Sequence, residues 1–219
     1  MDKIKTLARQ LETETDKGSQ VEILQQLVGE MLQGYMIKIA PHFRIYPIEV
    51  EAYYYHLESF PDTSVHTHEL QKSRFGQLYF HRQKPFDTDV ILDEGGGMDV
   101  CLSDSDSFFL TLFIRSARIN HEVDAVYGPE KLLRRVAEYV CSIKADKLTP
   151  QDIQKVKKLE LRDDVLVRAE KEVRPKGSIA IYSSRIGVDT NKYYEKASLR
   201  GIIEIDNLER RPLSQHLGK

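Results

Sequence analysis

The sequence predicts an α+β fold, in which helices pack around a curved and mostly antiparallel sheet within a single domain. Apolar residues recur with helical spacing near the N-terminus and again after residue 128. From residue 35 onward they alternate with polar residues, and short polar turns separate the alternating runs. Successive strands joined by short turns pair antiparallel, and 219 residues fit one domain.

Two helices are expected before the first strand. Residues 3–16 form a polar helix with a thin apolar stripe, which we expect to break at Gly18. Ser19 with Glu22 three residues later is the signature of a capping box, and it predicts a second helix that ends at Gly34. The stripe of the first helix consists of Ile4, Leu7, Ala8 and Leu11.

Strands with period two follow, and two further helices interrupt them. A helix is expected over residues 128–143, with Pro129 in its first turn, and another begins at Thr149 and Pro150. The expected strands are 35–40, 43–56, 76–82, 88–92, 95–103, 108–119, 159–170 and 178–188.

The chain divides into a helical extension at residues 1–20, a main domain at 21–205 and a polar tail at 206–219. No apolar run approaches the roughly 20 residues that a membrane span needs, and the N-terminus lacks the apolar core of a signal peptide. We therefore expect a cytoplasmic protein without membrane contact. Cys101 and Cys141 form no CxxC pair, which excludes a zinc ribbon and a redox motif.

The charge balance limits the kinds of partner. The formal net charge is −2, whereas proteins dedicated to nucleic acid usually carry a basic excess. Binding to nucleic acid would therefore need a local basic patch. Lys131 in the helix after residue 128 and Arg185 are candidates for such a patch.

The strand over residues 46–56 places carboxylates beside aromatic rings. Alternation along a strand sends Glu49, Glu51 and Tyr53 to the same face. One interpretation is a solvated sheet face. The other is a carboxylate in an aromatic pocket, where partial burial raises its pKa and suits it to general acid or base catalysis.

Two other patterns, a pair of histidines and a run of glycines, do not indicate a metal or cofactor site. His66 and His68 share a side of an extended segment, but no third ligand lies near them in sequence, so metal-dependent chemistry ranks last and we expect no metal. The glycines at 95–97 match neither a phosphate-binding loop nor a dinucleotide fingerprint, so a tight turn is expected there and no cofactor.

Taken in order, seven short segments resemble the alkyladenine (3-methyladenine, or methylpurine) DNA glycosylase family. The resemblance covers residues 21–205 and includes a strand with Glu-Ala-Tyr, a Gly-Pro-x-Lys-Leu motif and an Arg-Ile-Gly-Val motif. The segments are IEVEAYYYH, DTSVH, FGQLYFH, GGMDVCLS, LFIRSARI, YGPEKLLRRV and SRIGVDTNKYYEKASLRGII.

The resemblance implies a metal-free hydrolase that cuts the N-glycosidic bond of an alkylated purine flipped out of double-stranded DNA. Glu51 matches the glutamate that activates water, and Arg115 matches the arginine beside it. The base pocket would be formed by Tyr53, His66, Tyr79, His81 and Ser103, of which His81 replaces a tyrosine of the family and Ser103 replaces an asparagine.

The residues expected to contact DNA depart most from the family pattern. Gly96 stands where the family has an intercalating tyrosine, and Met98 follows it. An acidic insertion at 82–91 precedes them, and Asp99 replaces an aromatic residue. DNA contacts are still expected at Gly96, Met98, Lys131 and Arg185. The alternative is a protein that binds a nucleoside, a free base or another small ligand without turnover and has lost duplex intercalation.

Overall fold

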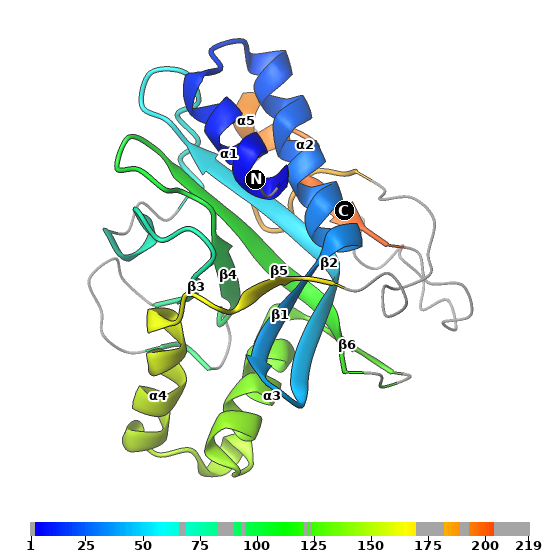
Figure 1. Cartoon of the computed structure of the whole chain (residues 1–219), viewed down its shortest axis with the longest axis vertical. Coiled ribbons are helices and arrows are strands. Elements are labelled where there is room, and N and C mark those ends of the chain that lie inside the picture. The colour runs from blue at the N-terminus through cyan, green and yellow to red at the C-terminus, as the bar shows by residue number, and fades with distance from the viewer. Residues whose placement is uncertain are drawn as a thin grey trace.

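The computed structural model describes residues 3–65, 69–82, 90–92, 95–120, 122, 124–169, 182–188 and 193–203. Within these residues the chain forms one α+β domain, in which helices pack around a curled antiparallel sheet (Figure 1). The expected fold class is therefore confirmed. None of the described helices has the length and apolar character needed to cross a lipid bilayer.

In the described part of the chain the sheet has eight strands, and all neighbouring strands pair antiparallel. The order is β3-β4-β5-β2-β1-β7, with β6 paired to β5 and β8 paired to β2. The strands are β1 (Tyr35–Ala40), β2 (Phe43–Tyr55), β3 (Leu78–Phe80), β4 (Met98–Cys101), β5 (Phe109–Ile119), β6 (Ala125–Tyr127), β7 (Leu166–Arg168) and β8 (Arg200–Ile202).

Helices lie at the two ends of this sheet in Figure 1. At one end α2 packs against β2 and β8 and is itself covered by α1, while α3 and α4 pack together at the other end. The helices are α1 (Lys3–Thr13), α2 (Lys17–Gly34), α3 (Pro129–Cys141), α4 (Pro150–Lys157) and α5 (Tyr193–Lys196).

The long pairing of β2 with β5 contains a bulge that aims a side chain. Along β5, Ser116 pairs with Glu49 and Ile114 pairs with Val50, so Arg115 is the extra residue between them. A bulge bends its strand and redirects the unpaired side chain. Arg115 is thereby turned toward the acidic residues of β2.

The predicted end of α2 and the predicted start of α4 are confirmed, whereas the capping box predicted at Ser19 and Glu22 is wrong, because Asp16 is the N-cap of α2. α2 ends at Gly34, and Thr149 forms a capping box at α4. The break expected at Gly18 is wrong, because Asp16 accepts a hydrogen bond from the Ser19 N–H at 2.8 Å and starts α2 before Gly18.

The expected strands at 88–92 and 178–188 are not strands in the part of each that the structure describes. The expected strand at 159–170 begins as a 3-10 helix, Lys158–Leu161, and is a strand only at β7. Val90 forms only an isolated bridge to Arg82, and Ser183 forms one to Arg200. The chain then turns at Gly187, whose φ of 76° ends any extended run. The short elements β6, α5 and β8 were not expected from the sequence.

Candidate functional site

One row of side chains crosses five strands of the sheet. Tyr79 pairs with Asp99, Asp99 with Phe113, Phe113 with Glu51, and Glu51 with Arg200. Residues directly opposite each other on neighbouring strands share a face of the sheet. This cross-strand row therefore places two carboxylates, Glu51 and Asp99, on either side of Phe113. Their strands are separated by one strand, so the spacing between strands puts their Cα atoms about 10 Å apart.

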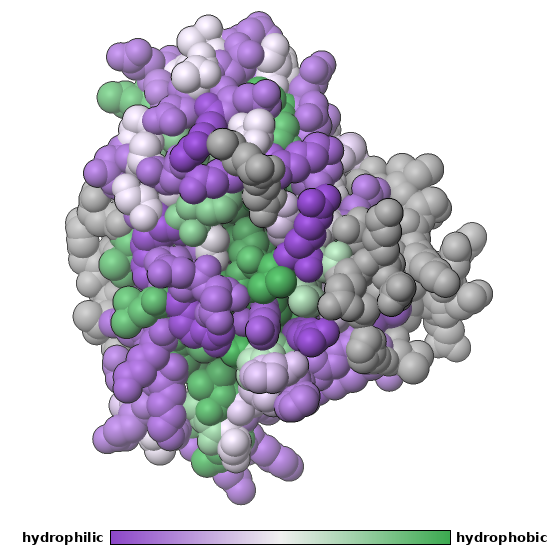
Figure 2. Space-filling view, viewed as in Figure 1, coloured by the Kyte–Doolittle hydropathy of each residue, from purple (hydrophilic) through white to green (hydrophobic). Residues whose placement is uncertain are grey.

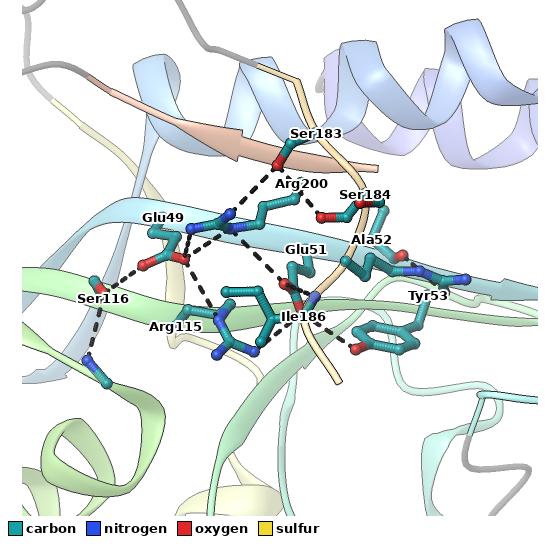
Figure 3. Close-up of polar contacts among 12 residues, drawn as sticks. Glu49, Glu51, Ala52, Tyr53, Arg115, Ser116, Ser183, Ser184, Ile186 and Arg200 are labelled. Carbon is teal, nitrogen blue, oxygen red and sulfur yellow. Dashed lines mark hydrogen bonds and ion pairs between the residues drawn. The ribbon is translucent and has the colours of Figure 1, made fainter. Parts of the chain in front are cut away.

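Glu51 is fully buried, and three different groups bind its carboxylate (Figure 3). The Tyr53 hydroxyl donates to Oε2 at 3.2 Å, and the Arg115 guanidinium donates to the same oxygen at 3.3 Å. The backbone N–H of Ile186 donates to Oε1 at 2.9 Å. The carboxylate is thus fixed in orientation from opposite sides.

Burial raises the pKa of Glu51, and its partners offset this only in part. Arg115, the Ile186 N–H, Tyr53 and Arg200 each act to lower the pKa, but the loss of hydration outweighs them. The pKa of Glu51 in the folded state lies above its ordinary value of 4.5. The neutral carboxyl therefore contributes its full stability below pH 4.5, and this stability is lost as the pH rises through the raised pKa. Holding Glu51 ionised therefore costs folding free energy, which is typical of functional groups.

A second acid, Glu49, completes a network of two carboxylates and two guanidinium groups (Figure 3). Arg200 donates to Glu49 at 2.8 Å, and the Ser116 hydroxyl donates to it at 2.6 Å. Arg115 spans the two acids, since it also lies 3.4 Å from Glu49. The positive charges are therefore shared between Glu49 and Glu51, and neither guanidinium is free to neutralise one acid alone.

A pocket of about 410 Å³ opens beside this network. Glu51 does not line the pocket, but Tyr53 and Ile186, which both hydrogen-bond to Glu51, form part of its wall. The carboxylate is therefore one side chain away from the cavity. The described residues that line the pocket are Tyr53, Thr63, Ser64, Gln71, His81, Asp99, Thr111, Ile186, Gly187 and Val188.

A buried ion pair holds the Tyr53 ring in place. Arg185 and Asp62 are both fully buried, with Nη1 and Oδ2 2.6 Å apart. The Arg185 guanidinium lies 4.7 Å from the centre of the Tyr53 ring, and the edge of Phe113 faces the same ring at 6.2 Å. A cation over an aromatic face stabilises that arrangement, so Asp62 and Arg185 position a wall of the pocket.

His81 and Asp99 also line the pocket. The imidazole stacks on Phe113 at 4.8 Å with 14° between the planes, and its Nε2 lies 3.0 Å from Asp99 Oδ2. Burial acts to lower the pKa of His81, but the charge and hydrogen bond of Asp99, with the backbone of Gly95, raise it overall. The pair therefore favours a charged imidazolium against a carboxylate.

Of the residues expected in the site, the structure brings Glu51, Arg115, Tyr53 and His81 together. Tyr79 shares the cross-strand row but lies under the Arg82 guanidinium, 5.0 Å from its ring centre, and is not among the described lining residues. His66 and the neighbouring His68 lie outside the described residues.

Five residues that were expected in the site or at the DNA surface lie elsewhere or have other surroundings. Ser103 does not face the pocket, because its buried hydroxyl donates to the backbone oxygens of Ser105 and Phe108 and fixes the turn between β4 and β5. Met98 and Arg185 do not reach the surface where DNA would bind, because both side chains are buried. Gly96 is buried, while Lys131 is exposed in the first turn of α3.

Sequence reasoning missed Arg200, Asp62 and the partnership of His81 with Asp99. Asp62 begins the DTSVH segment of the resemblance, but nothing in the sequence links it to Arg185. Arg200 comes from β8, which was not expected as a strand. Among the described residues, no group of histidines, cysteines and carboxylates is arranged to hold a metal ion.

Replacing Gly97 with alanine is expected to destabilise the protein and displace the stacked rings. A Cβ at this position would lie 2.3 Å from Phe113 Cε2 and 3.3 Å from His81 Cε1, so the rings must move. Overpacking of this kind costs about 1–3 kcal/mol. Urea unfolding measures this loss of stability. Gly34→Ala is the control, because a Cβ at position 34 would meet no atom closer than 3.7 Å. Equal stability of Gly97→Ala and wild type would contradict the close packing.

The rest of the visible face has no broad apolar area. Figure 2 shows hydrophobic residues as a narrow band in the middle of the described face, bordered by hydrophilic residues. Apolar patches that mark protein interfaces are larger and continuous. The pocket beside Glu51 is therefore the better candidate site.

Comparison with known proteins adds no family assignment. No protein-family model matches the chain, and no curated protein matches it significantly.

Proposed function

We propose that the protein hydrolyses the N-glycosidic bond of a damaged purine nucleotide that is extruded from double-stranded DNA, with Glu51 as the base that activates water. The observation that carries this proposal is the buried Glu51 carboxylate, fixed by Arg115 and by the Ile186 N–H one side chain away from a ring-lined pocket. A fixed, buried carboxylate with a raised pKa suits general base catalysis.

The bond changes follow from this arrangement. The water oxygen attacks C1′ of the deoxyribose, the bond from C1′ to the purine nitrogen breaks, and its electron pair leaves with the base. Glu51 takes the proton from the water and later returns it to the base or to solvent. Positive charge develops on the sugar in the transition state, and a nearby carboxylate stabilises it. The products are a free base and an abasic site.

For this reaction, water must pass the wall of the pocket to reach Glu51. Glu51 has no exposed surface, and the Tyr53 hydroxyl that binds it stands at the edge of the cavity. Water reaches the carboxylate when this hydroxyl moves aside as the nucleotide enters. The Tyr53 and His81 rings line the pocket, and under this proposal they stack on the base, which is how proteins hold flipped bases.

Duplex DNA methylated on its purines is the substrate that tests the proposal. Incubation with the protein is expected to release free methylated bases and to leave abasic sites, which chromatography and alkaline cleavage detect. Release no faster than in the absence of protein would contradict it.

Binding of a nucleoside or free base without turnover is the second candidate. It is favoured by the burial of Met98 and Arg185 and by the glycine at 96, because none of these three positions offers a side chain to fill the gap after base flipping. The net charge of −2 points the same way. In the same experiment this candidate predicts no base release, together with measurable binding of a purine nucleoside.

A further inference from the structure

We propose that Asp99 and Gln71 read the hydrogen-bond-donor edge of the bound base, so that the pocket selects guanine-type bases over adenine-type bases. This inference deepens the proposed function by naming the base that the same pocket accepts. It concerns recognition, so it is tested by binding and not by bond cleavage.

Asp99 carries a carboxylate oxygen that no described residue uses. Only 3% of the residue is exposed, and it lines the pocket. Its Oδ2 is paired with His81 Nε2 at 3.0 Å, whereas Oδ1 accepts no hydrogen bond from the described part of the chain. This oxygen is therefore available to accept a hydrogen bond from a ligand in the pocket.

Gln71 provides an independent acceptor in the same pocket. Its residue is 1% exposed, and its side-chain oxygen is buried without a hydrogen-bond partner. Buried polar atoms are nearly always satisfied, so each exception requires an explanation. Because Gln71 lines the pocket with Asp99, a single ligand with several donors explains both oxygens.

His81 occupies one oxygen of the Asp99 carboxylate and leaves the other oxygen to a ligand. The imidazole is fixed by its stack on Phe113 and faces Asp99, Tyr79 and Arg82 as its titratable neighbours. An ionised carboxylate accepts hydrogen bonds and donates none.

Purine edges differ in the donors that they offer to such acceptors. Guanine presents N1–H and the exocyclic amino group side by side, so two neighbouring donors point the same way. Adenine presents its amino group beside N1, which is an acceptor and repels a carboxylate. Two donors therefore match Asp99 and Gln71 only in the guanine-type base.

Calorimetric titration with guanosine, 1-methylguanosine and adenosine tests the selection. Wild type is expected to bind guanosine at least about 10-fold tighter than the other two, because 1-methylguanosine lacks N1–H and hydrogen bonds to charged groups are worth this much. Asp99→Asn is expected to lose the preference. Asp146→Asn, an exposed acid far from the pocket in sequence, is expected to keep it.

Equal affinity for guanosine and 1-methylguanosine, or no binding of any of the three at millimolar concentration, would overturn the inference. A preference that survives in Asp99→Asn would overturn the role of Asp99. If Asp99→Asn does not fold, the affinities of wild type for the three nucleosides test the inference by themselves. Release of bases from methylated DNA is scored separately, so that base release without nucleoside selection rejects this inference and leaves the proposed function intact.

Discussion

Replacing Asp62 with alanine is expected to lower the free energy of unfolding by about 3–5 kcal/mol, because it leaves a buried charge without a partner. Asp62 and Arg185 have no exposed side-chain surface, and the pair is 2.6 Å apart. Arg185 also donates to the backbone oxygen of Tyr194 at 3.0 Å, so the guanidinium cannot turn to solvent without breaking the fold there. The Tyr53 ring would lose the cation that lies against it.

An exposed ion pair provides the matched control. Glu122 and Arg135 are 3.4 Å apart, but nearly half of each side chain is exposed. Exposed pairs contribute only about 0–1 kcal/mol, so Glu122→Gln should change the unfolding free energy by less than 1 kcal/mol. Chemical denaturation of the two variants measures both values. A loss below 1 kcal/mol in Asp62→Ala would show that the pair does not support the pocket.

Local patterns in the sequence were sufficient to predict most of the fold. Alternation predicted β2, and the apolar run with Arg115 at its end predicted β5, because both patterns arise within one strand. Thr149 identified the start of α4 for the same reason. The short strands β6 and β8 carry three residues each, which is too few for periodicity to reveal.

The sequence predicted only the part of the candidate site that depends on residues close together in the chain. Glu49, Glu51 and Tyr53 share a face because strands alternate, which the sequence shows directly. The pairing of Glu51 with Arg200 depends on the register between β2 and β8, which joins residues far apart in the chain. The bulge at Arg115 likewise exists only in the pairing of two strands.

Replacing Glu51 with glutamine is expected to slow base release by about 10²–10⁴-fold, because the amide cannot take a proton from water. In wild type the carboxyl must be ionised to act, and burial raises its pKa above 4.5. The rate should therefore rise with pH through this raised pKa and then level off. The glutamine variant should lack that rise.

The most direct test of the account is the single-turnover rate of base release from methylated duplex DNA across pH, for wild type and Glu51→Gln. Glu138→Gln serves as the control, because this glutamate is partly exposed on α3, away from the pocket lining. The account predicts a pH-dependent rate in wild type and Glu138→Gln that falls at least about 100-fold in Glu51→Gln. Base release by Glu51→Gln at the wild-type rate and with the same pH profile would contradict the role of Glu51.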